Sequence, residues 1–211
     1  MPRSATTWLM FVLSDKLSPN QRMNNSAYPS EEFVIKTHTP ISLYAKYDTF
    51  TQVNIVRNPI DIIASVITKN FGGIGDTVSN GVAIASENPD MNIDSHILSE
   101  LQTYTGYAEG ALHNLDRLKV FTFDQVTKDI EYVSRILLGD HMAISNDDIP
   151  KLSISAARRI RVHKLAHPGL NNGMPCDKPA IYHAIKDRLL EHDLSKVNSL
   201  YGQLKDIAEN K

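Results

Sequence analysis

The chain has 211 residues, 22% of them charged, and a formal net charge of −2 at pH 7. This length suits one α/β domain with a sizeable core, so we expect a single domain over residues 1–211. The nearly balanced charge excludes a general basic field that would attract nucleic acid or a membrane surface, and we expect neither partner. Any anion site must therefore be local.

Cysteine usage and hydropathy favour a cytoplasmic protein. The lone cysteine, Cys176, forms neither an internal disulfide nor a zinc site by itself, which is typical of a reducing compartment. The apolar stretch at residues 8–13 is too short to span a bilayer, and Asp15 and Lys16 follow it closely. It also lacks the basic leader and the cleavage site of a signal peptide. We expect no membrane association.

Short buried strands are expected at three places. A helix over residues 6–17 comes first and opens after a polar turn. Three runs rich in β-branched and aromatic residues then predict strands at residues 33–36, 53–56 and 119–123. Helical patterns separate these strands, and such alternation predicts a parallel sheet. We therefore expect an α/β fold of three layers, in which a parallel sheet is flanked on both faces by helices.

Helices are expected after the second and third strands. Asn58 and Pro59 supply an N-cap and a first-turn proline for a helix over residues 60–69. An apolar stripe at helical spacing predicts a packing helix over residues 94–115. Three further helices are expected, over residues 124–138, 178–191 and 194–207.

A polar turn with one cation and three hydroxyl groups opens the first expected helix. Free N–H groups at a helix N-terminus, its positive dipole end and an adjacent arginine together form an anion site. An ordinary Ser/Thr-capped helix explains the hydroxyl groups equally well. The turn is not a Walker A loop, because no Gly-Lys-Ser/Thr closes it, and this disfavours an ordinary kinase. Its residues are Pro2, Arg3, Ser4, Ala5, Thr6, Thr7, Trp8 and Leu9.

A second anion site is expected where the second strand ends. Arg57 lies at that point, and open α/β sheets bind ligands at this edge. Ser65 follows the Asn58 cap by seven residues, so the two share a helix face about 10 Å apart along the axis. An arginine fork and a hydroxyl group on one face suit a phosphate. A capped helix after a buried strand is also common without any ligand.

Two further places carry candidate side chains. The first expected strand ends in Lys36, and His38 follows it. A histidine there is either a structural hydrogen-bonding residue or a general base, since its ordinary pKa of about 6.5 suits proton uptake at neutral pH. Phe123 ends the third expected strand. It and Trp8 are candidates for stacking on an adenine ring, although both are equally expected as core residues.

These segments resemble, in the same order, the motifs of PAPS-dependent sulfotransferases, where PAPS is 3′-phosphoadenosine 5′-phosphosulfate. The family pattern Pro-(Lys/Arg)-Ser-Gly-Thr-Thr-Trp-Leu matches residues 2–9 except at Ala5. The pattern Lys-Thr-His-x-Pro matches residues 36–40, and Arg-Asn-Pro-x-Asp-x-x-x-Ser matches residues 57–65 at every fixed position. The resemblance covers roughly residues 2–137 and implies a P-loop nucleoside triphosphate hydrolase-like architecture.

The resemblance also implies the cofactor and where it binds. PAPS would be the co-substrate, 3′-phosphoadenosine 5′-phosphate the product, and no metal ion would be needed. The 5′-phosphosulfate would lie on the turn formed by Arg3, Ser4, Ala5, Thr6, Thr7 and Trp8. The 3′-phosphate would bind Arg57 and Ser65, and Phe123 would contact the adenine.

The implied reaction is in-line transfer of a sulfuryl group to a hydroxyl or amine. His38 would take the proton of the acceptor, while Arg3 and Lys36 would stabilise negative charge on the bridging oxygen and the sulfuryl group. The acceptor would be a small molecule or a glycan. Its pocket is expected from the glycine- and proline-rich loops at residues 71–92 and 166–179.

The chain departs from the family pattern at two places. No strand precedes the turn at residues 2–9, and no Arg-Lys-Gly run occurs near the C-terminus. A basic cluster either replaces that run or forms a solvated helix face; it consists of Arg158, Arg159, Arg161, His163 and Lys164. Two alternatives stay open: a kinase-like phosphotransferase that uses ATP and magnesium, and a non-catalytic nucleotide-binding protein.

Overall fold

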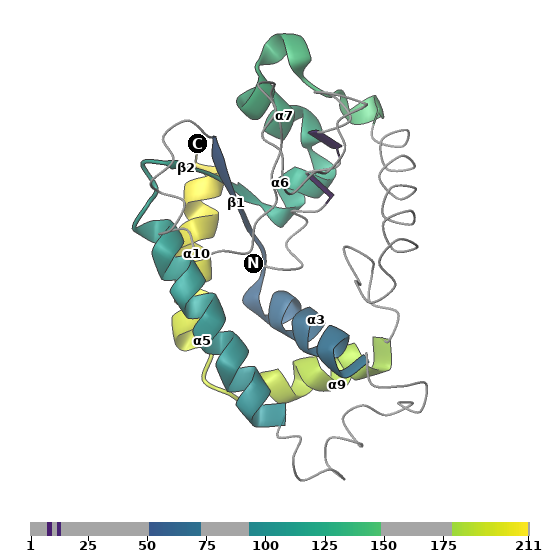
Figure 1. The fold of residues 1–211 in the computed structure, drawn as a ribbon, viewed down its shortest axis with the longest axis vertical. Coiled ribbons are helices and arrows are strands. Elements are labelled where there is room, and N and C mark those ends of the chain that lie inside the picture. The colour runs from purple at the N-terminus through teal and green to yellow at the C-terminus, as the bar shows by residue number, and fades with distance from the viewer. Residues whose placement is uncertain (1–7, 10–11, 14–50, 73–92, 149–178, 211) are drawn as a thin grey trace, which may run out of the picture. The chain divides into compact units, whose positions relative to one another are not determined.

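The computed structural model describes residues 8–9, 12–13, 51–72, 93–148 and 179–210. In this part of the chain the fold is mixed α/β and mostly helical, with two parallel strands (Figure 1). The described elements belong to two compact units, and each is described by itself. The expected strand at residues 33–36 lies outside the described residues, as do the expected loops beyond residue 72. The expectation of a single domain stays a prediction.

The first unit holds both strands and four long helices. Its elements are β1 (Gln52–Val56), α3 (Pro59–Gly72), α5 (Ile93–Leu112), β2 (Leu118–Thr122), α9 (Pro179–Leu189) and α10 (Ser195–Glu209). The strands pair in parallel, with Gln52 opposite Leu118 and Val56 opposite Thr122. Parallel pairing brings the carboxyl ends of β1 and β2 to one edge of the sheet. The second and third expected strands are thus confirmed, although β2 ends one residue early.

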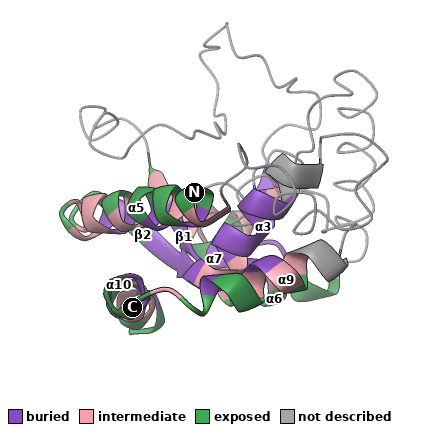
Figure 2. Ribbon diagram, turned by 90° about the horizontal axis from the view of Figure 1, so that it is seen from below, coloured by how far each residue is buried: buried purple, intermediate pink, exposed green. Residues whose placement is uncertain are grey.

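The core of the first unit lies where the helices pack on each other and on the strands. α10 packs against α5 and β2, and α3 packs against α9 and α5. Both strands and α3 are mostly buried (Figure 2). The buried side chains of α5 recur every three or four residues, as a helix with one packed face requires; they are Ile97, Leu101, Tyr104, Ala108 and Ala111.

The long expected helix over residues 94–115 is confirmed with two differences. α5 begins one residue earlier and ends at Leu112, because the chain then turns, with the N–H of Asn114 donating to the carbonyl of Ala111 at 3.1 Å. Leu98, expected on the apolar stripe, is 50% exposed. The two C-terminal helices are confirmed as α9 and α10, with ends shifted by one or two residues.

The second unit contains a cluster of short helices. They are α6 (Phe123–Lys128), α7 (Ile130–Leu138), η1 (Asp140–Met142) and η2 (Asn146–Asp148). Trp8, Leu9, Val12 and Leu13 are also helical and belong to this unit. The expected helix over residues 6–17 is therefore seen at these four residues, and its other residues lie outside the described part.

The expectation of one helix over residues 124–138 is wrong, because the chain breaks at Asp129. The Asp129 carboxylate accepts a hydrogen bond from the N–H of Tyr132 at 3.2 Å, so it caps a new helix. Its backbone has left the helical region, at φ −137° and ψ 63°. An aspartate offers the backbone this alternative to helical hydrogen bonding. The break separates α6 from α7 and lets Val126 and Ile130 both be buried.

Candidate functional site

The end of β1 forms a compact strand–turn–helix unit. The side-chain oxygen of Asn58 accepts a hydrogen bond from the N–H of Ile60 at 2.9 Å, and its carbonyl accepts one from Ile62 at 3.1 Å. Asn58 is therefore the N-cap of α3, and Pro59 occupies the first helical position. The expected cap and the expected helix are confirmed, and α3 extends to Gly72.

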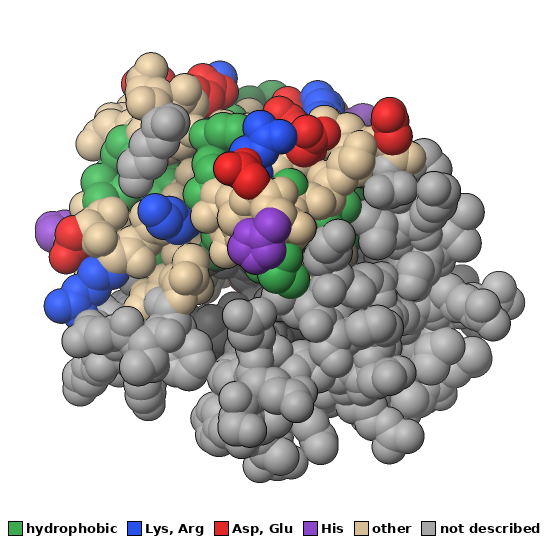
Figure 3. Space-filling model, turned by 90° about the horizontal axis from the view of Figure 1, so that it is seen from above, with side chains coloured by type: hydrophobic (Ala, Val, Ile, Leu, Met, Phe, Trp, Pro, Cys, Tyr) green, Lys and Arg blue, Asp and Glu red, His purple; other side chains and the backbone are tan. Residues whose placement is uncertain are grey.

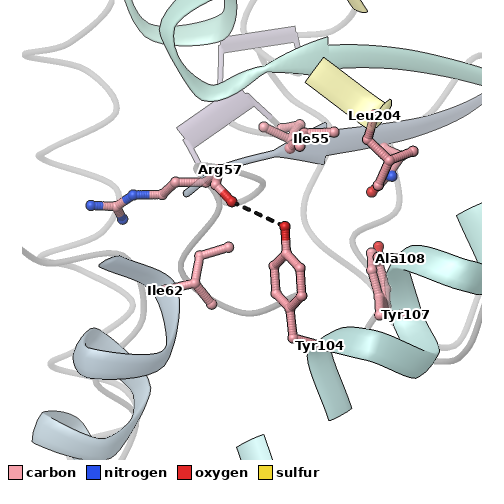
Figure 4. Close-up of a pocket in the computed structure, with 9 residues that line it drawn as sticks. Ile55, Arg57, Ile62, Tyr104, Tyr107, Ala108 and Leu204 are labelled. Atoms are coloured by element: carbon pink, nitrogen blue, oxygen red, sulfur yellow. Dashed lines mark hydrogen bonds between the residues drawn. The ribbon is translucent and has the colours of Figure 1, made fainter. Parts of the chain in front are cut away.

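Arg57 lies between the strand and the cap, where its backbone and side chain have different surroundings. Its carbonyl accepts a long hydrogen bond of 3.4 Å from the hydroxyl of Tyr104 on α5. Its guanidinium extends in the opposite direction, away from Tyr104 and Ile55 (Figure 4). The cation thus projects from the carboxyl edge of the sheet, next to the positive dipole end of α3.

Ser65 lies two turns further along the same helix. It follows Asn58 by seven residues, which places it about 10 Å further along the axis on nearly the same face. Ser65 is only 8% exposed, and residues 62–68 around it are all buried. Arg57 and Ser65 are therefore held by one rigid strand–helix unit, as the sequence predicts.

Asp61 adds a negative charge to the first turn of α3. Its carboxylate accepts hydrogen bonds from the Tyr182 hydroxyl at 2.8 Å and from Nζ of Lys186 at 3.0 Å, both on α9. Burial alone raises the pKa of Asp61, but the hydrogen bonds from Lys186 and Tyr182 and the charges of Lys186 and Arg57 outweigh it. The pKa of Asp61 therefore lies below its ordinary value, and the carboxylate is ionised at neutral pH.

This cluster is the part of the site that sequence reasoning missed. Tyr182 and Lys186 follow Asp61 by 121 and 125 residues, so no local pattern joins them. The available signals were an acid in a helical first turn and a Tyr–Lys pair four residues apart on the ninth helix. Neither signal identifies the other as its partner.

A small cavity lies behind Arg57, on the side of its carbonyl. Its volume is about 10 Å³, close to the smallest that holds one water molecule and far below the roughly 300–1,000 Å³ of ligand pockets. Burial raises the pKa of Tyr107 to about 12 and raises that of Tyr104 as well, so both phenols stay neutral. The cavity is packing space and not the nucleotide site. Its lining includes Asn54, whose side-chain oxygen is buried without a partner in the described part of the chain.

The remaining expected site residues fall into two groups. Trp8 and Phe123 belong to the second unit and are half-buried. Phe123 begins α6, so the expectation that it ends a strand is wrong. The others lie outside the described residues; they are Arg3, Ser4, Ala5, Thr6, Thr7, Lys36 and His38.

Charge and comparisons with known proteins complete the description. Acidic and basic side chains are intermixed on the face drawn in Figure 3. Among the described residues, no helix is long and apolar enough to cross a membrane, and no group of three metal-ligating side chains occurs. No protein-family profile, curated protein or solved structure matches the chain.

Proposed function

We propose that this chain is a PAPS-dependent sulfotransferase whose 3′-phosphate site is formed by Arg57 and Ser65. The observation that carries the proposal is the unit at the end of β1. There, every fixed residue of the pattern Arg-Asn-Pro-x-Asp-x-x-x-Ser lies on the element that the pattern requires: a strand end, an N-cap, a first turn and a helix face.

The electrostatics of this unit favour a doubly charged phosphate. The Arg57 guanidinium projects beside the N-terminus of α3, and the helix dipole and a cation both favour an anion there. A guanidinium offers two parallel N–H groups to phosphate oxygens, and the Ser65 hydroxyl supplies a neutral donor further along the helix. The 3′-phosphate separates PAPS from adenosine 5′-phosphosulfate and from ordinary adenine nucleotides.

The fold proposed here is a three-layer, P-loop nucleoside triphosphate hydrolase-like sheet in a cytoplasmic protein. The parallel pairing of β1 with β2 and the return of the chain through helices between them support this architecture. The 5′-phosphosulfate is assigned to residues 3–8 on the sequence resemblance. Trp8 and Phe123 are proposed adenine contacts on the same basis.

The proposed reaction moves a sulfuryl group without a metal ion. The acceptor hydroxyl or amine, on a small molecule or a glycan, attacks the sulfur of PAPS. The bond from sulfur to the 5′-phosphate oxygen breaks, and its electron pair leaves with 3′-phosphoadenosine 5′-phosphate. His38 takes the acceptor proton, and Arg3 and Lys36 stabilise the charge that develops on the oxygens. These three roles are proposed from the sequence motifs.

The test is a comparison of two nucleotides that differ in the 3′-phosphate. Calorimetry with 3′-phosphoadenosine 5′-phosphate should show that Arg57→Ala weakens binding by about ten- to a hundredfold, because a charge-assisted hydrogen bond is lost. Adenosine 5′-monophosphate should be nearly unaffected. Ser65→Ala should change the same ratio in the same direction by less, since it removes a neutral donor.

A matched control is Arg117→Ala, which removes an arginine from the turn before β2 in the same unit. This variant should leave both affinities unchanged. Equal weakening of both nucleotides by Arg57→Ala would show that the residue acts through general electrostatics or stability, and the 3′-phosphate assignment would then fail.

A further inference from the structure

The turn that carries Arg57 also carries an acid that opposes anion binding. Asp61 is the third residue of α3, and a carboxylate in a helical first turn interacts favourably with the helix dipole. A phosphate held by Arg57 at the same helix end would compete with Asp61 for that positive end. It would also be repelled by the carboxylate. The site therefore needs a means to offset the charge of Asp61.

α9 supplies this compensation from a distant part of the sequence. Nζ of Lys186 lies 3.0 Å from the Asp61 carboxylate and the Tyr182 hydroxyl lies 2.8 Å from it, on successive turns of one helix face. The side chains of Lys186 and Asp61 are 37% and 31% exposed, so solvent screens the pair only in part. The three groups together are close to neutral.

We infer that Lys186 and Tyr182 are positioning residues for phosphate binding: they hold the Asp61 carboxylate on α9 and offset its charge. This inference rests on the proposed function, because it assumes that the 3′-phosphate binds Arg57. Arg57 precedes Asp61 by four residues, and its charge already contributes to lowering the pKa of Asp61. Without Lys186 the carboxylate would act more strongly on Arg57 and on the phosphate.

The experiment is a charge cycle with Lys186→Met, Asp61→Asn and the double variant. Calorimetry measures the affinities for 3′-phosphoadenosine 5′-phosphate and for adenosine 5′-monophosphate. Lys186→Met should weaken only the former, by roughly two- to fivefold, the size expected for a partly exposed ion pair. The double variant should return near the wild-type ratio, because it removes both charges. Asp61→Asn alone should tighten binding of the 3′-phosphate.

Two further variants separate this role from packing and from net charge. Lys196→Met breaks a comparable ion pair between α10 and α5, in which Nζ of Lys196 lies 2.8 Å from Glu109, and it should leave the ratio unchanged. Tyr182→Phe removes one hydrogen bond but no charge, and it should act in the same direction as Lys186→Met with a smaller effect. Thermal melting verifies that each variant is folded.

The outcomes distinguish the inference from the function on which it rests. If the double variant is as weak as Lys186→Met, α9 acts only as packing, and the inference is overturned while a wild-type preference for the 3′-phosphate upholds the function. If Lys186→Met does not fold, Asp61→Asn decides: an unchanged ratio overturns the inference. A wild-type protein without any preference for the 3′-phosphate refutes the proposed function, and the inference with it.

Discussion

Asp61 is the single residue whose ionisation should be visible in the stability of the protein. Its folded-state pKa lies below the ordinary value of 3.8. The ionised carboxylate therefore stabilises the fold above that pH, and the contribution disappears as the pH falls through the lower folded-state value. We expect Asp61→Asn to lower the free energy of unfolding near pH 6 by about 1 kcal/mol or less, and the difference to vanish near pH 3.

Urea denaturation at both pH values measures this difference. Asp187→Asn is the control, because Asp187 is an exposed acid on the same helix as Lys186. It should show no comparable trend. A deficit of Asp61→Asn that stays constant over the whole range would mean that the amide disturbs packing and that the charge contributes little.

What could be predicted at this scale depended on sequence separation. The roles of Asn58 and Pro59 follow from neighbours within four residues, so the cap was predicted correctly. The pairing of Asp61 with Tyr182 and Lys186 joins segments more than a hundred residues apart. Such a pairing depends on how α3 packs against α9, which no local pattern encodes.

Among the elements, the cap of α7 offers the clearest test. Asp129 accepts hydrogen bonds from the N–H of Tyr132 at 3.2 Å and from the side-chain amide of Asn146 at 3.1 Å. Asp129→Ala should lower the free energy of unfolding by about 0.5–2 kcal/mol, the usual cost of losing an N-cap. Chemical denaturation followed by circular dichroism measures the loss.

The matched control is Asp124→Ala in α6. Asp124 forms an exposed ion pair with Lys128 at 3.1 Å, and such a pair contributes only about 0.3–0.5 kcal/mol. Equal losses for the two aspartates would contradict the capping role of Asp129.

The same residue shows why element boundaries were harder to predict than element types. The apolar spacing runs without interruption from residue 124 to residue 138, so it predicts one helix. The chain breaks because the Asp129 side chain satisfies the first N–H groups of α7 better than a continued helix would need. An aspartate directly before an apolar run is the signal that was overlooked.

For the whole molecule, a ligand that binds only the folded state should raise the melting temperature. We expect 3′-phosphoadenosine 5′-phosphate to stabilise the protein by mass action, and magnesium-ATP to do so less at equal concentration. Differential scanning fluorimetry measures both shifts. A larger shift with magnesium-ATP would instead favour a kinase-like phosphotransferase.

The arrangement of the chain was predictable only to the level of its class. Strands that alternate with helices indicate parallel pairing, and β1 and β2 pair in parallel. That these two strands are neighbours, with Gln52 opposite Leu118, depends on how α5 and α10 fill the space around them. Such packing reflects side-chain volumes across the core rather than any local run of residues.

The burial of α3 on all sides limits how this sequence can change in length. Residues 62–68 are all buried, and the Thr68 hydroxyl donates to the carbonyl of Ala64 at 2.6 Å within them. Inserting or deleting one residue after Pro59 would rotate everything beyond it by about 100°. Ser65 would leave the face of Asn58, and the buried isoleucines would lose their partners at the same time. The spacing between Arg57 and Ser65 is therefore fixed by the core, whichever ligand the site binds.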